Sequence, residues 1–247
     1  MVSRAKLRLS YCLDIGRSLP FGTVQLRSLW PILAAPADSV LLHHASFGPV
    51  ADIPNLPRVL LLGDSISMGY TIPVRTQLKG IANVHRPQEN CSHTRFALNR
   101  LEDWLRGGKW DAIHFNFGLH DISLDGDRQV VPPQEYANNL IALVGRLKRT
   151  GAALAWASTT PVLRDLSCKD PVRGNTFTQR SKDVDVYNEI AAEIMAANDV
   201  PVDDLNGLSK ARITELQIPD DIHFCRQGYA FLGATVAGFL RRRLTSR

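Results

Sequence analysis

The sequence has few of the features that mark membrane, metal-binding or disulfide-stabilised proteins. No run of about 18 apolar residues is present, so no transmembrane helix is expected. Only 4 cysteines occur in 247 residues, and none forms a C-x-x-C pair. This spacing argues against a zinc or redox site and defines no disulfide framework. No internal repeat or low-complexity segment is present, so we expect an ordinary globular chain with a large core.

The excess of positive charge lies at the ends of the chain. The formal net charge is +5, but residues 1–57 carry five basic and three acidic side chains, and the last seven residues carry four arginines. After the +2 and +4 of these two ends are subtracted, residues 58–240 have a formal charge of −1. A neutral central region argues against a nucleic-acid partner.

Residues 1–57 are expected to form an N-terminal extension, because they lack clear periodicity and contain six prolines. Residues 28–36 are mostly apolar and follow several basic residues, as in a late signal peptide, but this run is short and contains Pro31. We therefore expect a loose leader or a start codon placed too early. The default location is cytoplasmic, with export as the alternative.

From Arg58 onward, short apolar segments alternate with amphipathic ones. Strands are expected at residues 59–62, 82–85, 110–117, 152–157 and 200–202, and helices at 96–105, 133–149, 184–197 and 226–243. This alternation predicts a flavodoxin-like three-layer α/β/α sandwich with a five-stranded parallel sheet over residues 58–247. In such sheets, ligands bind beyond the carboxyl ends of the strands.

A candidate nucleophile follows the first expected strand. In Gly63-Asp64-Ser65, the serine stands at a tight strand-to-helix turn, where the helix N-terminus favours negative charge. A serine is a weak nucleophile and needs a base within hydrogen-bond reach. The alternative interpretation of this segment is a simple helix N-cap.

A candidate base precedes the last expected helix, in Asp220-Asp221-Ile222-His223. A carboxylate three residues before a histidine can accept a hydrogen bond from Nδ1–H, which leaves Nε2 free to face the serine. We therefore predict Asp220 as the residue that orients His223. The alternative is a loop histidine beside a solvated acidic pair.

Two further polar clusters follow expected strands. His120, in Gly118-Leu119-His120-Asp121, could donate a hydrogen bond to a developing oxyanion. The loop at residues 89–94 contains Ser92, and its backbone N–H groups could complete the oxyanion hole. The other histidines show no spacing typical of a metal site.

The order of these four clusters resembles the SGNH (GDSL-like) hydrolase superfamily over residues 58–243. The GDS block of the family matches Gly63–Ser65, and its D-x-x-H block matches Asp220 and His223. In the third block the usual asparagine is replaced by His120, and in the second block Ser92 takes the place of a glycine. The resemblance therefore covers about three quarters of the chain, with two departures.

The resemblance implies an esterase without a cofactor. Ser65, His223 and Asp220 would be catalytic, and Ser65, Ser92 and His120 would form the oxyanion hole. The expected substrate is a short acyl ester of a carbohydrate or another small molecule. Alternatives are acyl transfer by the same residues, or a non-catalytic module that binds acylated glycans. Because histidine titrates near neutrality, His120 also predicts an alkaline limb in the pH–rate profile.

Overall fold

The computed structural model describes residues 43–106, 108–169 and 176–245. The apolar segment at residues 28–36 lies outside these ranges. The described elements, in chain order, are β1 (Arg58–Leu62), α2 (Ser65–Gln77), β2 (Asn83–His85), α3 (Thr94–Leu105), β3 (Ala112–Phe115), β4 (Leu124–Asp125), β5 (Arg128–Gln129), α4 (Pro133–Lys148), β6 (Ala153–Ala157), β7 (Leu166–Lys169), β8 (Thr176–Gln179), α5 (Ser181–Ala197), β9 (Val202–Asp203), α6 (Leu205–Lys210), α7 (Ile213–Leu216) and α8 (Arg226–Thr245).

The centre of the fold is a five-stranded parallel sheet with the order β2-β1-β3-β6-β9. Counted along the chain, this is the 2-1-3-4-5 order of flavodoxin-like folds. Leu60 of β1 pairs with His85 on one side and with Ile113 on the other. Strands β1 and β3 are buried almost throughout, which explains why they are continuously apolar in sequence. The predicted parallel sheet is confirmed.

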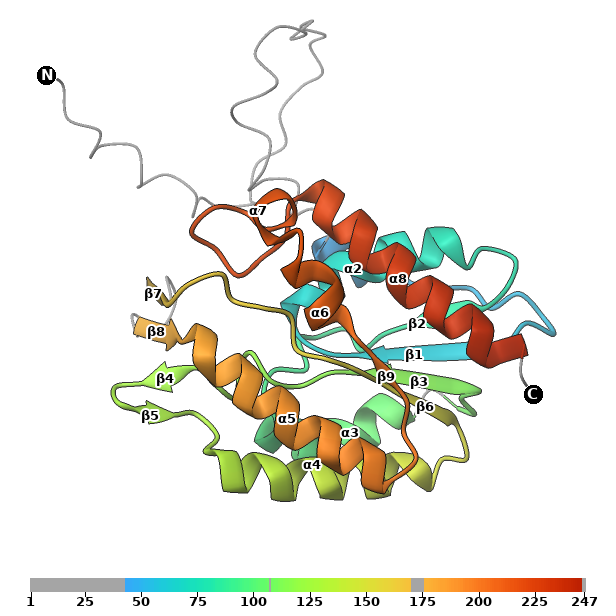
Figure 1. Ribbon diagram of the computed structural model, residues 1–247. Helices are drawn as coiled ribbons and strands as arrows, with labels where there is room; N and C mark the ends of the chain where they lie inside the picture. The colour runs from blue at the N-terminus through green and yellow to red at the C-terminus, as the bar shows by residue number, and fades with distance from the viewer. Residues whose placement is uncertain (1–42, 107, 170–175, 246–247) are drawn as a thin grey trace, which may run out of the picture. The chain divides into compact units, whose positions relative to one another are not determined.

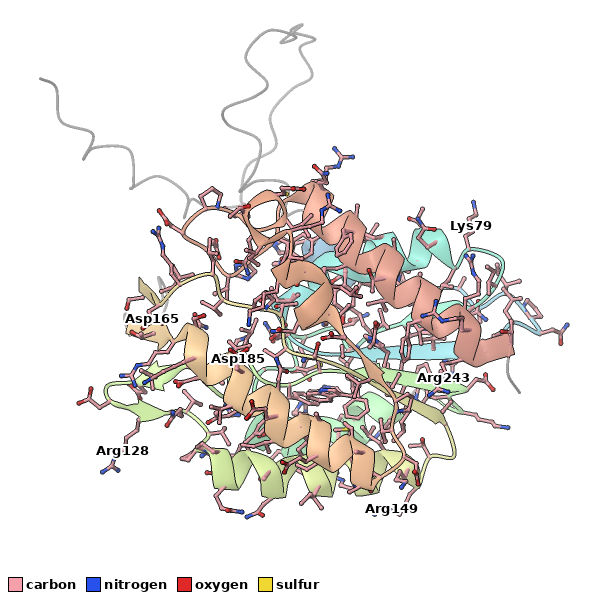
Figure 2. All side chains as sticks on the ribbon, viewed as in Figure 1. Lys79, Arg128, Arg149, Asp165, Asp185 and Arg243 are labelled. Carbon is pink, nitrogen blue, oxygen red and sulfur yellow. The ribbon has the colours of Figure 1, made fainter. Side chains whose placement is uncertain are left out.

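Helices cover both faces of this sheet (Figure 1). Helices α2 and α8 pack together on one face, and α3, α4 and α5 lie side by side on the other. Charged side chains project outward from this sandwich, including those labelled in Figure 2: Lys79, Arg128, Arg149, Asp165, Asp185 and Arg243. The predicted three-layer architecture is therefore confirmed.

Glycines bring α2 and α8 unusually close together. A Cβ atom on Gly69 would lie 2.1 Å from the Tyr229 ring, and one on Gly233 would lie 2.3 Å from Cβ of Pro73. A glycine inside a helix costs about 1 kcal/mol relative to alanine, so these positions trade helix propensity for close packing. The beginning of α2 is thereby held against the beginning of α8.

A second sheet was not expected from the sequence. It is antiparallel, has the order β5-β4-β8-β7, and consists of strands with only two to four residues each. Such short strands give too few alternating positions for a periodicity signal. The short helices α6 and α7 were missed for the same reason.

The last residues of the expected extension are tied to the edge of the parallel sheet. The Asn83 side chain accepts a hydrogen bond from the Ile53 N–H (2.9 Å) and donates to the Ile53 carbonyl (3.0 Å). The Asp52 carboxylate contacts both Arg58 and His85, at 2.8 and 2.6 Å.

Among the described helices, none is both long enough and apolar enough to span a membrane.

Candidate active site

Ser65 is the first residue of α2 and directly follows the turn after β1. The side chain of Asp64 caps this helix, because Oδ1 accepts a hydrogen bond from the Ile66 N–H at 2.9 Å. At Gly63, a Cβ atom would lie 2.9 Å from Cβ of Ser67, so the turn is tight enough to favour glycine. Ser65 is the first residue of the helix, so no carbonyl of a preceding turn accepts a hydrogen bond from its N–H. This N–H is therefore available to a ligand.

The Ser65 hydroxyl is within hydrogen-bond distance of the His223 imidazole. The distance from Ser65 Oγ to His223 Nε2 is 2.9 Å, and the distance from His223 Nδ1 to Asp221 Oδ1 is 2.7 Å. If Nδ1–H donates to the carboxylate, the Nε2 lone pair faces the serine hydroxyl, as a general base requires. The structure thus brings Ser65 and His223 together as the sequence suggested.

The carboxylate that orients His223 belongs to Asp221, not to Asp220. Asp220 adopts a left-handed conformation (φ 60°), and its carboxylate forms an ion pair with Arg164. Asp221 Oδ1 also accepts a hydrogen bond from the backbone N–H of His223 (3.1 Å), an Asx-type turn that places it under the ring. The predicted contact between Asp220 and His223 is therefore wrong. The D-x-x-H spacing led to the neighbouring residue.

Electrostatics favour an ionised Asp221. Partial burial raises the pKa of its carboxyl group, but the hydrogen bond and charge of His223 outweigh this effect, so the pKa lies below its ordinary value. The side chains of His223 and Asp221 remain 28% and 40% exposed. A substrate in water can therefore reach this pair.

His120 lies near the triad, as expected for an oxyanion donor. Burial lowers the pKa of its imidazole; the Asp64 carboxylate opposes this shift and His223 adds to it. A lowered pKa disfavours the charged form of His120, and a neutral imidazole offers one N–H to a ligand. This direction speaks against the predicted alkaline limb, which requires His120 to change its charge in the working range.

Ser92, where the resemblance places a glycine, adopts a backbone conformation that glycine favours. Its φ angle is 54°, in the left-handed region that a serine occupies only at an energetic cost. Its N–H donates to Asn90 Oδ1 at 2.8 Å, within its own loop. Ser92 can serve an oxyanion only if the Asn90 side chain shares this N–H or turns away from it.

Buried contacts fix the loop that contains Ser92 relative to the turn before Ser65. The Arg86 guanidinium donates to Ser67 Oγ (3.0 Å) and to the Gly63 carbonyl (3.2 Å), and the Cys91 N–H also reaches the Gly63 carbonyl (3.3 Å). Cys91 is a free, buried thiol. Arg86 was missed in the sequence, although its position directly after a strand of the sheet was a signal that could have identified it.

Asp121 joins the third cluster to the beginning of α3. Its Oδ1 accepts hydrogen bonds from the Thr94 N–H (2.9 Å) and the Thr94 hydroxyl (2.6 Å). Burial raises the pKa of Asp121 to about 7, although the hydrogen bonds from Thr94 lower it. This contact ties the loop of His120 to the loop of Ser92.

A second histidine–aspartate pair is buried against the parallel sheet. His114 Nε2 on β3 is 3.1 Å from Asp203 Oδ2 on β9, and these side chains are 0% and 3% exposed. No group of three or more histidine, cysteine or acidic side chains placed to hold a metal ion occurs in the described ranges.

Comparison with known proteins relates this geometry to a family. Residues 61–231 match the model of the GDSL-like Lipase/Acylhydrolase family. No curated protein matches the chain in sequence.

Several solved structures share the fold. A lipase/acylhydrolase from Enterococcus faecalis is 21% identical, with a TM-score of 0.61 over 76% of this chain and 97% of that chain. An acetyl xylan esterase is 14% identical, with a TM-score of 0.61 over 74% and 99% of the two chains. An acetylxylan esterase from Geobacillus stearothermophilus is 16% identical, with a TM-score of 0.55 over 76% and 94%. At these identities the likeness concerns the fold.

Proposed function

The chain belongs to the GDSL-like lipase/acylhydrolase family and is an ester-hydrolysing enzyme; from this premise we propose that it works through an acyl-serine intermediate on Ser65. The observation that carries the proposal is the continuous chain of contacts from Ser65 through His223 to Asp221, at 2.9 and 2.7 Å. A serine needs such a base, and the base needs a partner that fixes its tautomer. These intact contacts favour catalysis over a non-catalytic binding module.

In the first half of the reaction, Ser65 Oγ attacks the ester carbonyl carbon while its proton moves to His223 Nε2. The resulting imidazolium is stabilised by the Asp221 carboxylate. The carbon–oxygen bond to the leaving alcohol then breaks, and the same proton passes from His223 to that alcohol. The products of this half are an acyl-Ser65 ester and the free alcohol.

In the second half, a water molecule attacks the acyl carbon and gives one proton to His223. The bond from the acyl carbon to Ser65 Oγ breaks, and His223 returns the proton to the serine. The carboxylic acid leaves, and the enzyme is restored without a cofactor.

The negative charge of each tetrahedral intermediate develops on the former carbonyl oxygen. We assign its stabilisation to the N–H of Ser65 and the ring N–H of neutral His120, with the N–H of Ser92 joining when Asn90 releases it. Donors of this kind act strongly because they are in place before the charge develops.

The proposed substrate is a short acyl ester of a carbohydrate or of another small molecule. Two fold neighbours are acetylxylan esterases by name, and the partly exposed His223 and Asp221 suit a substrate that is itself well solvated. A cavity of about 460 Å³ lined by Trp104, Trp110 and Glu89 includes none of the triad residues, so it does not extend the site for a long chain.

The test combines active-site labelling with ester kinetics. A fluorophosphonate probe should label wild-type protein at Ser65, and p-nitrophenyl acetate should give a burst equal to the labelled fraction. Ser65→Ala should lose both signals, whereas Ser167→Ala, which changes an exposed serine on β7, should keep them.

Chain-length preference tests the substrate class separately. We expect kcat/KM to fall from p-nitrophenyl acetate to the butyrate and octanoate esters. A preference for octanoate would refute the short-acyl assignment but leave the acyl-serine mechanism intact. Labelling at another serine, or an active Ser65→Ala variant, would refute the mechanism itself.

A further inference from the structure

A histidine from the segment before the family-matching region lies against the catalytic histidine. The ring centroids of His43 and His223 are 5.6 Å apart, with an angle of 57° between the ring planes. The match to the family begins only at residue 61, so no family motif covers His43. The described chain therefore adds a residue of its own to the surroundings of the base.

The segment that carries His43 is held in place by local contacts. Residues 43–46 are helical, and the fully buried Ser46 donates from Oγ to the His43 carbonyl at 2.6 Å. Just beyond this turn, the Phe47 ring lies 5.6 Å from the Arg86 guanidinium, which also contacts the Gly63 turn. His43 is thus anchored near the nucleophile turn as well as near the base.

Tyr229 links His43 to the loop of the base. His43 Nε2 lies 3.3 Å from the Tyr229 hydroxyl, and the Tyr229 ring packs against the ring of Phe224, the residue after His223, with centroids 5.9 Å apart. The Tyr229 ring itself is fixed in the space that Gly69 leaves on α2. One chain of contacts therefore runs from His43 through Tyr229 to the residue beside the base.

The protonation states of Tyr229 and His43 allow the Tyr229 hydroxyl to donate a hydrogen bond to His43 Nε2. Burial raises the pKa of Tyr229 above its ordinary value, so the hydroxyl stays protonated and can donate. Burial, followed by the charges of His223 and Arg86, lowers the pKa of His43 to about 4, so the ring is neutral at neutral pH and Nε2 accepts in the tautomer that carries the proton on Nδ1. A neutral ring can lie beside the imidazolium that forms during catalysis without repelling it.

We propose that His43 is a positioning residue of this esterase, covering one face of His223 and, through Tyr229, holding Nε2 on Ser65. The proposal rests on the proposed function, because it assigns His43 a role only if Ser65 and His223 perform the chemistry. It extends the working site beyond the residues that the family motifs mark.

The primary variant is His43→Ala in the full chain. Because a displacement of about 1 Å between reacting groups can cost about 100-fold in rate, we expect kcat to fall roughly 10- to 100-fold, with a smaller change in KM. The matched control is His44→Ala, which removes the exposed neighbouring histidine and should keep wild-type kcat.

A second readout separates positioning from general stability. Solvation favours the charged form of an imidazole, so uncovering His223 should move the acid limb of the kcat/KM profile toward higher pH. His43→Gln keeps an acceptor for the Tyr229 hydroxyl and should restore most of kcat. Tyr229→Phe keeps the ring and should lower kcat, and its effect should not add to that of His43→Ala.

The pH experiment has a defined set of interacting groups. The titratable or charged groups that face His43 are His44, Arg86, Asp221, His223 and Tyr229. Those that face His223 are His43, Ser65, His120 and Asp221. Variants are therefore compared at one ionic strength over one pH range, with thermal midpoints measured alongside.

The outcomes separate this inference from the proposed function. If wild-type protein is labelled at Ser65 but His43→Ala keeps both kcat and its acid limb, the role of His43 is refuted and the mechanism stands. If wild-type Ser65 is not labelled, both proposals fail. If His43→Ala does not fold, the decision passes to Tyr229→Phe, and an unchanged kcat in that variant would overturn the proposal.

Discussion

Two histidine–aspartate pairs in this protein make the same kind of ring-nitrogen-to-carboxylate contact in opposite surroundings. In one, His223 and Asp221 are 2.7 Å apart, partly exposed, and 2.9 Å from a serine hydroxyl. In the other, His114 Nε2 and Asp203 Oδ2 are 3.1 Å apart and buried, and the His114 ring also contacts the Tyr70 ring of α2. The contact alone does not make a catalytic site. Access to solvent and a nucleophile on the second nitrogen distinguish the two pairs.

The largest expected effect would come from the carboxylate of the exposed pair. Asp221→Asn lets the ring adopt the wrong tautomer, and in a Ser–His–Asp triad this change lowers kcat by about 10⁴-fold. Asp220→Asn is the matched control, because it changes the adjacent residue, whose carboxylate pairs with Arg164. Steady-state kinetics on p-nitrophenyl acetate would measure both, and a larger loss in Asp220→Asn would reverse our assignment.

The buried pair should respond in stability instead of turnover. His114→Ala would leave the Asp203 carboxylate buried without its histidine, and removal of one partner of a buried pair costs about 3–5 kcal/mol of unfolding free energy. Urea denaturation would measure this loss, and His114→Gln, which keeps a donor, should lose less. The kcat per fluorophosphonate-labelled serine should stay at the wild-type value. A fall in that ratio comparable to Asp221→Asn would end the distinction between the two pairs.

His120 sharpens the comparison, because it is a histidine near the triad on which the Asp64 carboxylate acts through its charge and, in the described part of the chain, not through an ion pair. Its pKa is lowered by burial, so above that pKa it stays neutral and its single N–H donates independently of pH. We expect His120→Asn to keep substantial activity, and His120→Ala to lose about 10²- to 10³-fold in kcat, as when one oxyanion donor is removed.

A pH–rate profile from about pH 5 to about pH 9, which brackets the ordinary histidine range, checks the protonation of His120. Only an acid limb is expected in wild type, and it should remain in His120→Asn. An alkaline limb that disappears in His120→Asn would show that protonated His120 is the working donor.

The sequence predicted the parts of the fold that depend on long periodic segments. The five parallel strands and the helices that cover them leave clear apolar patterns, and the helices on the two faces follow from their alternation with strands. The antiparallel sheet of β4, β5, β7 and β8 has strands too short for any periodicity. Its formation depends on contacts between residues far apart in the chain.

Within the site, the sequence located Ser65 and His223, because each stands next to an element boundary that the pattern reveals. It selected Asp220 over Asp221 from the D-x-x-H spacing, which was wrong, since the contact with His223 depends on the backbone of Asp220, where the chain adopts a left-handed conformation. It gave no indication of His43, because proximity across the fold leaves no local pattern. Spacing therefore identifies candidates, but the turn geometry decides which of them meet.

The glycine contacts between α2 and α8 bear on how long the catalytic geometry persists. Ser65 begins one of these helices, and only Phe224 and Cys225 separate His223 from the start of the other. Both catalytic side chains are therefore attached to one closely packed helix pair. The free energy of opening is small for surface loops, whereas for tightly packed helices it approaches the free energy of global unfolding. The lifetime of the bond between Ser65 and His223 should therefore follow that of the whole folded domain, not that of the loops around it.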